Sequence, residues 1–568
     1  MKYTREEYDR FLLAEIDAQK KGYEDLVCTR ALVLKARGDI FVGRYLSVKG
    51  DGMLVFKVRN SDTMPRKNSY WTACYFSDEM GSFKNWGTLS WAELRENYQR
   101  RYSDAYCAWI SKSDDLDFCL VGIKGITLEL ASLLEEDKPI IAFGPKDPPL
   151  KYLFNLRDLV ADEKDERLKT ILDYEENRVD WNPALVEANS DFSSILSEQL
   201  ERFDGVVVQG PPGVGKTYRI AQFASRLLLE NKSVLVTALT NQALMELAEK
   251  EAIAPYLAAG KVSKTSLTVD EKKRLHQLET VIDNKCNATA GRLTLATFYV
   301  SSGWAKDIEM QAFDYVLMDE ASQALLPMIA ATLKLGSKVI WIGDQQQLPP
   351  IVLVTEDISV RYGWGAMISG FETICTSFNY PSYMLKDTFR LTLRGASITG
   401  VFYSNNLSSV AEYREIPSAL AFTNRSGGPV LLKLNLRIGD TSPENAFGWI
   451  FEKVQALLVE NSETSIAILS KLRDSVRDLQ KYYLMRGQTK ELPDKLKIET
   501  VDRVQGLTVD YCFFLIPNTS VKYSLNEHLF NVATSRARYN TFIIADNNIL
   551  GSPMSENVRE FLLRTMKD

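Results

Sequence analysis

The sequence has little histidine, no paired cysteines and no long apolar run. Only two histidines occur, and the seven cysteines stand apart without a CxxC pair, so neither a zinc site nor a disulfide framework is expected. The first 21 residues, MKYTREEYDRFLLAEIDAQKK, carry charges among their apolar positions, unlike a signal peptide or a membrane span. We therefore expect an intracellular protein, in the cytoplasm, nucleoid or nucleus, without a membrane partner and without zinc.

The chain also lacks an excess of positive charge. Its formal charge of −6 gives no support to a protein that coats nucleic acid by bulk electrostatics. The charge does not exclude a local groove that binds nucleic acid through hydroxyls and amides. With 568 residues the chain is too long for one hydrophobic core, and roughly three or four domains are expected.

The first part of the chain divides into three stretches of different character. Thr4 and Glu7 predict a capping box that opens an amphipathic helix within residues 1–26. Short β-branched and aromatic runs between turn signals predict a small β-barrel within residues 27–155. Residues 156–203 have a charged helical pattern and are expected to form a stalk, with a solvated linker as the alternative.

After residue 203 apolar strands alternate with helices, as in VVVQG, SVLVTAL, DYVLMDE, KVIWIGD, AILS, YCFFLI and FIIAD. Continuous apolar strands with intervening helices are typical of parallel sheets covered on both faces. There are enough strands for two sheets, which we expect in two domains, 204–378 and 379–568. A segment at about 250–292 interrupts the first domain and is expected to be helical, with a basic solvated surface as its ordinary interpretation.

A glycine-rich loop follows the first of these strands. The sequence GPPGVGKT at 210–217 ends an apolar run and opens a helix-like segment. Its glycines let backbone N–H groups surround an anion, Lys216 reaches the terminal phosphates, and Thr217 can hold magnesium. The pattern predicts a nucleotide site that comprises Gly210, Pro211, Pro212, Gly213, Gly215, Lys216 and Thr217.

Two acids and a glutamine at later strand ends complete this chemistry. In FDYVLMDEAS, Asp319 is the candidate magnesium ligand and Glu320 the candidate base that activates water. Taken alone, two adjacent acids could also mark a helix N-terminus. Gln347, in the loop of WIGDQQQLPP, is placed to sense the terminal phosphate through water.

The motifs GPPGVGKT, DEASQ, GDQQQLPP, TFR, TVDRVQGLTVD and NVATSRAR occur in this order within about residues 190–550. Together they resemble the superfamily 1 helicases of subgroup B, which include up-frameshift-type RNA helicases, immunoglobulin-switch-binding helicases, Dna2 nuclease-helicases and coronavirus helicases. The resemblance implies an α/β fold with two tandem RecA-like P-loop domains, preceded by a small β-barrel on a helical stalk. It also implies ATP and Mg²⁺ as cofactors, and 5′ to 3′ movement.

The resemblance also implies roles for single residues. Arg390 and Arg536 look like the arginines that reach the γ-phosphate, with Arg538 as a neighbour, while Phe389 matches the aromatic residue that stacks on the base unless it is a core residue. Gln505 and Gly506 resemble the segment that links the phosphate to the nucleic-acid strand, and Asp502 is expected to orient this loop. The implied contacts to the polymer, each also a common helix cap or turn residue, are Thr240, Asn241, Thr297, Ser470 and Thr500.

The chain departs from the family at the base of the nucleotide. Relatives read adenine with a glutamine well upstream of the phosphate loop, whereas Gln199 lies nearer to the loop than expected. Adenine selectivity is therefore open. The cysteine- and histidine-rich zinc module of several relatives is absent from the sequence.

Three classes of function follow. The first is an ATP-dependent helicase or translocase on single-stranded DNA or RNA, which hydroxyl and backbone contacts need not distinguish. The second is an ATP-gated switch or assembly factor that binds nucleic acid or protein partners without unwinding. The third, a nuclease with a motor attached, needs an acidic cluster, for which the run DDLD at 114–117 is the candidate.

Overall fold

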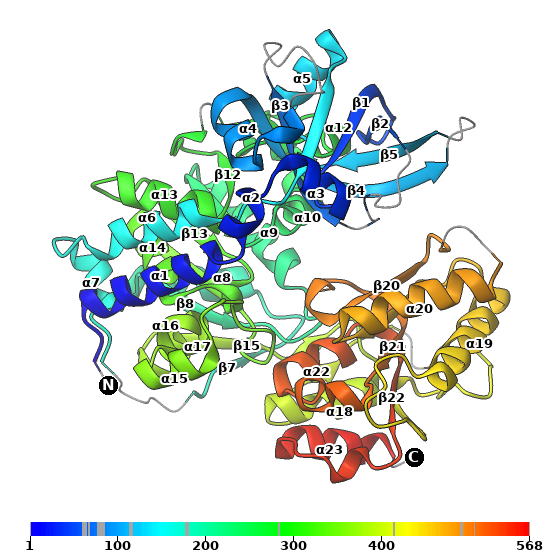
Figure 1. Cartoon of the computed structure of the whole chain (residues 1–568). Coiled ribbons are helices and arrows are strands. Elements are labelled where there is room, and N and C mark those ends of the chain that lie inside the picture. The colour runs from blue at the N-terminus through cyan, green and yellow to red at the C-terminus, as the bar shows by residue number, and fades with distance from the viewer. Residues whose placement is uncertain are drawn as a thin grey trace.

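The computed structural model describes residues 2–59, 65, 67, 69–76, 86–112, 117–175, 181–281, 284–412, 415–488, 492–504 and 506–566. Figure 1 shows a small barrel at the top, an α/β region beneath it with the N-terminal helix along its side, and a second α/β region at the lower right that carries the C-terminus. Among the described helices, none is both long enough and apolar enough to cross a bilayer.

Six antiparallel strands close into the barrel, and their order around it is β1 (Phe41–Val48), β2 (Leu54–Arg59), β5 (Phe118–Lys124), β4 (Gln99–Lys112), β3 (Ser69–Phe76) and β6 (Ile140–Gly144). Aromatic rings fill the interior, among them the stacked pair Phe41 and Phe143. A closed sheet has no free edge. The structure thus confirms the predicted β-barrel, which is flanked by the helices α2 (Tyr23–Val27), α3 (Ala31–Arg37), α4 (Trp91–Tyr98) and α5 (Leu128–Asp137).

The structure confirms a helical stalk between the barrel and the first sheet, but only part of the predicted range 156–203 belongs to it, because β7 (Ala184–Val186) and α8 (Phe192–Arg202) join the first sheet and its cover. The helices of the stalk are α1 (Arg5–Lys20), α6 (Leu150–Val160) and α7 (Glu166–Leu172). The predicted capping box opens α1, because the Thr4 hydroxyl accepts from the Glu7 N–H and the Glu7 carboxylate accepts from the Thr4 N–H. Lys334, a buried residue of the first sheet's helical layer, donates to Asp162 at 2.9 Å. Ion pairing and apolar packing therefore fix the stalk to that layer, and it is not a solvated linker.

Nine parallel strands form the first sheet, in the order β11 (Glu279–Thr280), β10 (Val262–Lys264), β12 (Leu293–Thr297), β9 (Val234–Ala238), β13 (Phe313–Met318), β14 (Gly336–Gly343), β8 (Gly205–Gln209), β15 (Ser382–Leu385) and β7 (Ala184–Val186). The strands β7 and β15 lie outside the predicted range 204–378. The chain returns to pair β15 with β8 before it crosses to the second sheet. Helices of this region are α8 (Phe192–Arg202), α9 (Lys216–Leu229), α10 (Asn241–Ala248), α11 (Ala254–Ala258), α12 (Val269–Arg274), α13 (Phe298–Asp307), α14 (Leu326–Leu335), α15 (Glu356–Tyr362), α16 (Gly365–Ile368) and α17 (Gly370–Ser377).

The segment 250–292 is only partly helical, since it also contributes β10 and β11 to the edge of the first sheet. It supports the barrel. Val269 packs into the barrel core, and the Asp270 carboxylate accepts from the Gly125 N–H at 3.0 Å. Gly52 lies so close that a Cβ there would come within 2.5 Å of the Asp270 Cα. The barrel is thus held by the insertion as well as by the stalk.

One buried ion pair stabilises this insertion. The Lys264 ammonium lies 3.0 Å from the Glu271 carboxylate, and both side chains are almost fully buried. Breaking such a pair leaves a buried charge unpaired, so Glu271→Gln should lower the free energy of unfolding by about 3 kcal/mol. A lower urea midpoint, followed by circular dichroism, would show this loss. Glu279→Gln, which breaks the exposed pair with Arg292, is the control and should cost less than about 1 kcal/mol.

The second sheet has five parallel strands, in the order β18 (Gly428–Leu434), β22 (Ala537–Asp546), β21 (Val509–Leu515), β19 (Ile466–Ser470) and β20 (Leu496–Thr500). A two-stranded ladder of β16 (Asp387–Thr388) and β17 (Ser408–Ser409) lies near the crossover. One face is covered by α18 (Leu393–Thr399), α22 (Glu527–Thr534) and α23 (Glu556–Thr565), and the other by α19 (Glu444–Glu460) and α20 (Arg473–Arg486). The short α21 (Val521–Ser524) precedes α22. The two covered parallel sheets confirm the predicted fold class.

Candidate nucleotide and nucleic-acid site

The phosphate loop runs from the end of β8 to the start of α9, as the glycine pattern predicts. Gly213 and Gly215 have φ of +77° and +78°, a conformation that glycine adopts without strain. A Cβ at Gly210 would lie 2.3 Å from the Cγ of Lys216. The Lys216 ammonium donates to the Gly210 carbonyl. These glycines therefore permit a tight loop whose lysine folds back across it.

Lys216 is partly buried and lies among charges of both signs. Burial lowers the pKa of Lys216, while the charges of Asp344 and Asp319 raise it and those of Arg390 and Arg536 lower it further. Phosphate oxygens are suitable partners for such a partly buried ammonium. The same balance shows that both arginines lie within electrostatic reach of the phosphate loop.

Thr217 and Asp319 meet at the edge of the sheet. The Thr217 hydroxyl donates to an Asp319 carboxylate oxygen at 3.2 Å. Burial raises the pKa of Asp319, and the charge of Lys216 opposes this shift. A hydroxyl and a carboxylate are oxygen ligands of the kind that Mg²⁺ prefers. The pair fits magnesium, which when bound would neutralise charge on the phosphate oxygens.

Glu320 combines a rare backbone conformation with an unpaired carboxylate oxygen. Its φ is +54°, the left-handed region that costs a residue with a side chain about 1 kcal/mol or more. Within the described part of the chain its Oε2 is buried without a hydrogen-bond partner. Burial, and next the charge of Asp319, raises the pKa of Glu320 to about 7. A buried oxygen with spare acceptor capacity is what a base for an attacking water requires.

The side chains of the two assigned arginines donate hydrogen bonds to carbonyls at the C-terminal end of α22. The Arg390 guanidinium donates to the Ser535 carbonyl at 3.0 Å, and the Arg536 Nε donates to the Val532 carbonyl at 2.8 Å. Arg536 is 2% exposed, and its Nη2 has no partner among the described residues. Burial lowers the pKa of Arg536 to about 10, so the cation persists at neutral pH. Arg538 instead is exposed and pairs with Asp510 at 3.3 Å.

Two hydrogen bonds join the phosphate loop to the segment before Arg390. The Thr388 hydroxyl donates to the Pro212 carbonyl at 2.8 Å, and the Phe389 N–H donates to the Gly213 carbonyl at 2.9 Å. A Cβ at Gly213 would lie 2.4 Å from the Cβ of Arg390. Glycine at this position therefore lets the segment of Arg390 lie directly against the phosphate loop.

Phe389 lies outside the core, which excludes the alternative interpretation of a core residue. Its side chain is 52% exposed. A Cβ at Gly215 would lie 4.0 Å from the Phe389 ring and 3.9 Å from the Cβ of Tyr218, a second exposed aromatic residue. Two aromatic rings thus flank the mouth of the phosphate loop, and sequence reasoning identified only Phe389.

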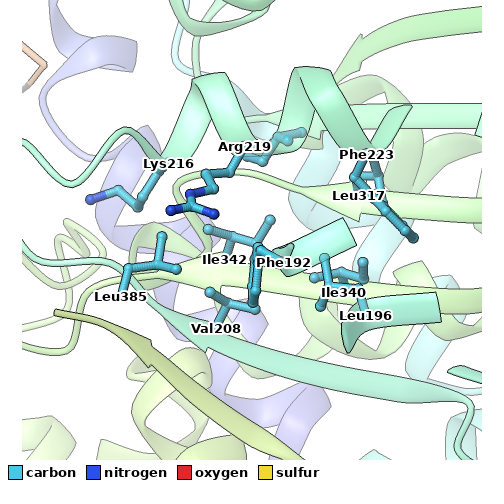
Figure 2. A pocket seen from close by; sticks show the side chains of 11 residues that line it. Phe192, Leu196, Val208, Lys216, Arg219, Phe223, Leu317, Ile340, Ile342 and Leu385 are labelled. Atoms are coloured by element: carbon cyan, nitrogen blue, oxygen red, sulfur yellow. The ribbon is translucent and has the colours of Figure 1, made fainter. Parts of the chain in front are cut away.

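The pocket behind the phosphate loop is too small for a nucleobase. Figure 2 shows it lined by apolar side chains of the sheet, α8 and α9, with Lys216 and Arg219 at one side. Its open volume of about 10 Å³ suits about one water. Arg219 donates to the carbonyls of Ala188 at 2.7 Å and Ser190 at 3.1 Å. Among the described residues, no hydrogen bond joins Gln199 to the phosphate loop.

Gln347 belongs to a buried hydrogen-bond network. Its amide donates to Asp344 Oδ2 at 2.9 Å, and the same oxygen accepts from the Tyr403 hydroxyl at 2.8 Å. The Asn531 amide donates to the Tyr403 oxygen and to the Gln346 carbonyl, both at 2.8 Å. Sequence reasoning missed three of these residues. Asp344 lies in the motif GDQQQLPP and Asn531 in NVATSRAR, so the polar side chains of these motifs could have indicated both residues. Tyr403 lies in no motif.

The five candidate polymer contacts lie at carboxyl ends of parallel strands. Thr240 and Asn241 follow β9, whereas the other three end β12, β19 and β20 and are largely buried; these are Thr297, Ser470 and Thr500. The Thr240 hydroxyl caps α10 by accepting from the Ala243 N–H. The Thr500 hydroxyl donates to Glu499 at 3.4 Å, and the Ser470 hydroxyl has no partner within the described chain.

The segment that is expected to link the phosphate to the strand is described only in part. Gly506 has open space around it, and Gln505 lies outside the described residues.

An aromatic face of the barrel lies opposite the end of β20. Tyr70 and Tyr106 have ring centroids 5.0 Å apart. The guanidinium of Arg503, three residues after Thr500, lies 6.0 Å from the Tyr70 ring centroid, and the Lys146 ammonium lies 5.3 Å from it. Sequence reasoning placed the barrel but missed these rings, because tyrosines in a strand ordinarily pack against neighbours.

A family model described as an AAA domain matches residues 294–355, which include Asp319, Glu320 and Gln347. The chain is 24% identical over 404 residues, or 63% of its length, to DNA replication ATP-dependent helicase/nuclease DNA2 of Saccharomyces cerevisiae. It is also 24% identical over 447 residues, or 70% of its length, to DNA replication ATP-dependent helicase/nuclease JHS1 of Arabidopsis thaliana. These alignments cover 26% and 32% of the relatives, so the chain spans about a third of their length or less.

Among solved structures, an arterivirus nonstructural protein 10 (helicase) overlays 89% of this chain and 79% of its own at 12% identity, with a TM-score of 0.37. The sequence relatives and the ordered motifs are the stronger comparison. By its motifs, the AAA domain match and these relatives, the chain is similar to the Dna2-like helicases of superfamily 1.

Proposed function

We propose that the chain is an ATP-dependent helicase or translocase that moves 5′ to 3′ on single-stranded nucleic acid. The observation that carries this proposal is the approach of two arginines, fixed on α22 of the second sheet, to Lys216 of the first. Fixed cations from one domain complete the charge around phosphates that the other domain holds. The relatives' names, which include helicase and ATP-dependent, support the same function.

In this mechanism the first domain holds the phosphates and the second supplies the missing charge. Lys216 and the loop amides bind the phosphate oxygens, and Glu320 accepts a proton from the attacking water. Arg390 and Arg536 stabilise the charge of the transition state only while the two sheets are close. Hydrolysis therefore requires closure, and loss of the phosphate allows the domains to separate.

We assign the polymer to the carboxyl ends of the strands. Hydroxyl and amide groups there, including those of Thr240 and Asn241, would bind phosphates and sugars without reading sequence. Tyr70 and Tyr106 would stack on bases as the strand passes between the barrel and β20, since every base has an aromatic face. The neighbouring cations of Lys146 and Arg503 suit the backbone of the strand.

A nuclease activity gains no support from the described residues. They contain no group of three or more histidine, cysteine, aspartate or glutamate side chains placed to hold a metal ion. Within the run DDLD, residues 114–116 lie outside the described residues. The relatives' nuclease function, named for proteins of which this chain covers a third or less, is not carried over.

A strand-displacement assay tests the proposal. The substrates are DNA and RNA duplexes with a 5′ or a 3′ single-stranded tail. We expect displacement from the 5′ tail, with ATP hydrolysis stimulated by the single strand. Lys216→Ala should reduce both activities to background, because the ammonium that binds the phosphates is removed. Lys261→Ala, at an exposed position of the same domain, is the matched control and should retain both.

Each other outcome has a distinct meaning. Hydrolysis that responds to no single strand would overturn the proposal. Stimulated hydrolysis without displacement or movement would instead favour an ATP-gated switch or assembly factor. Repeating the hydrolysis assay with GTP, CTP and UTP would measure the base selectivity.

A further inference from the structure

The helix α22, whose C-terminal end accepts hydrogen bonds from the two arginines, is also bonded directly to the first domain. Asn531 lies on α22, one turn before Ser535 and Arg536. Its amide donates across the domain boundary to the Gln346 carbonyl at 2.8 Å. The same amide donates to the Tyr403 hydroxyl, which in turn donates to Asp344 of the first domain at 2.8 Å. Two hydrogen bonds thus cross between the domains at one place.

The bond between Tyr403 and Asp344 is buried and ends on a charged carboxylate. Tyr403 is 4% exposed and Asp344 1%. Burial, and next the charge of Asp344, raises the pKa of Tyr403 well above its usual range, so the hydroxyl keeps its proton and acts as a donor. A hydrogen bond to a buried carboxylate is stronger than one between neutral groups. The contact therefore favours the closed arrangement of the two sheets.

The network also reaches the groups that surround the phosphates. Asp344 Oδ2 accepts from Gln347, and the charge of Asp344 is the largest one that raises the pKa of Lys216. On the other side, α22 holds Arg390 through Ser535 and Arg536 through Val532. One continuous set of contacts thus links the phosphate side of the first domain to both arginines of the second.

We propose that Asp344, Tyr403 and Asn531 form an interdomain latch that positions α22, and with it Arg390 and Arg536, when the two sheets close. The inference deepens the proposed function and rests on it. Tyr403 and Asn531 are positioning residues, since they act through the arginines. The latch makes hydrolysis depend on domain closure through side chains of both domains as well as through the nucleotide.

The test removes one oxygen from the latch. Tyr403→Phe keeps the buried ring but loses the bonds to Asp344 and Asn531. We expect the strand-stimulated kcat to fall about tenfold, which corresponds to about 1.4 kcal/mol in the barrier. The KM for ATP should change less than about twofold, because arginines that act in the transition state contribute little to binding the ground state. Tyr8→Phe, which removes a buried hydroxyl without a partner in the described stalk, should leave both constants unchanged.

Two further measurements separate a latch from a general structural role. Asn531→Ala should lower kcat similarly, and the double variant should cost clearly less than the product of the two losses, since both residues belong to one network. Without nucleotide, the α22 amides should exchange hydrogen faster in Tyr403→Phe than in the wild type, with the barrel amides unchanged.

The outcomes distinguish the latch from the proposed function. Wild-type kcat together with wild-type exchange in Tyr403→Phe would overturn the latch, as would faster exchange throughout the chain. If the wild-type chain hydrolyses no ATP, the proposed function fails, and the exchange of α22 still decides whether the latch exists.

Discussion

Glu320→Gln is expected to lower the rate of ATP hydrolysis by roughly 10²–10⁴-fold, the contribution typical of a positioned general base, while ATP binding is retained. Glutamine has nearly the same shape but cannot accept the proton of the attacking water. Folding should not suffer, because burial and the charge of Asp319 already raise the pKa of Glu320 to about 7 and a neutral side chain removes that cost. Phosphate release measures the rate, and a fluorescent ATP analogue measures binding.

Glu246→Gln is the matched control for this prediction. Glu246 lies exposed on α10, and its charge is among those that raise the pKa of Glu320. Its substitution removes a nearby carboxylate without removing the buried one, so the rate should stay within about twofold, as for other surface substitutions. Hydrolysis by Glu320→Gln at the wild-type rate would mean that another group activates the water.

The phosphate side of this site could be predicted from sequence because each part has a local requirement. The loop at 210–217 needs glycines where a Cβ would collide, and Gly210 and Gly213 meet that requirement in the structure. Asp319 and Gln347 follow apolar strands, and the carboxyl ends of parallel strands share one edge of a sheet. A position at the carboxyl end of a parallel strand therefore predicts that a residue lies near the residues at the other strand ends, even when the order of the strands is not known.

Features that depend on distant contacts could not be predicted. The strands β7 and β15 have three and four residues, too few for a clear apolar pattern. β10 and β11 have three and two residues, and they interrupt a segment whose charges suggest a helix. Tyr403 meets Asp344 across 59 residues and Asn531 across 128, and a tyrosine after an apolar run ordinarily indicates a core position. Its role arises only when the two domains come together.

Arg536→Ala is expected to lower kcat by about 10³–10⁵-fold, the contribution of an arginine that stabilises transferring phosphate, with ATP binding reduced far less. The guanidinium is buried with one nitrogen unpartnered in the described structure, so its removal should not destabilise the fold. Arg536→Lys should stay impaired by more than about tenfold, because an ammonium cannot bond the Val532 carbonyl and a phosphate with one planar group. Arg538→Ala, which loses only the exposed pair with Asp510, is the control.

Combining this variant with the latch variant tests how the two act. If Tyr403 works by positioning the arginines, Tyr403→Phe should lower kcat far less in the Arg536→Ala background than in the wild type, since the main group that it positions is already gone. Full additivity of the two losses would show instead that Tyr403 affects hydrolysis through the phosphate loop or Gln347. The same comparison in the Glu320→Gln background should remain additive, because that base lies on the first domain and is held without help from α22.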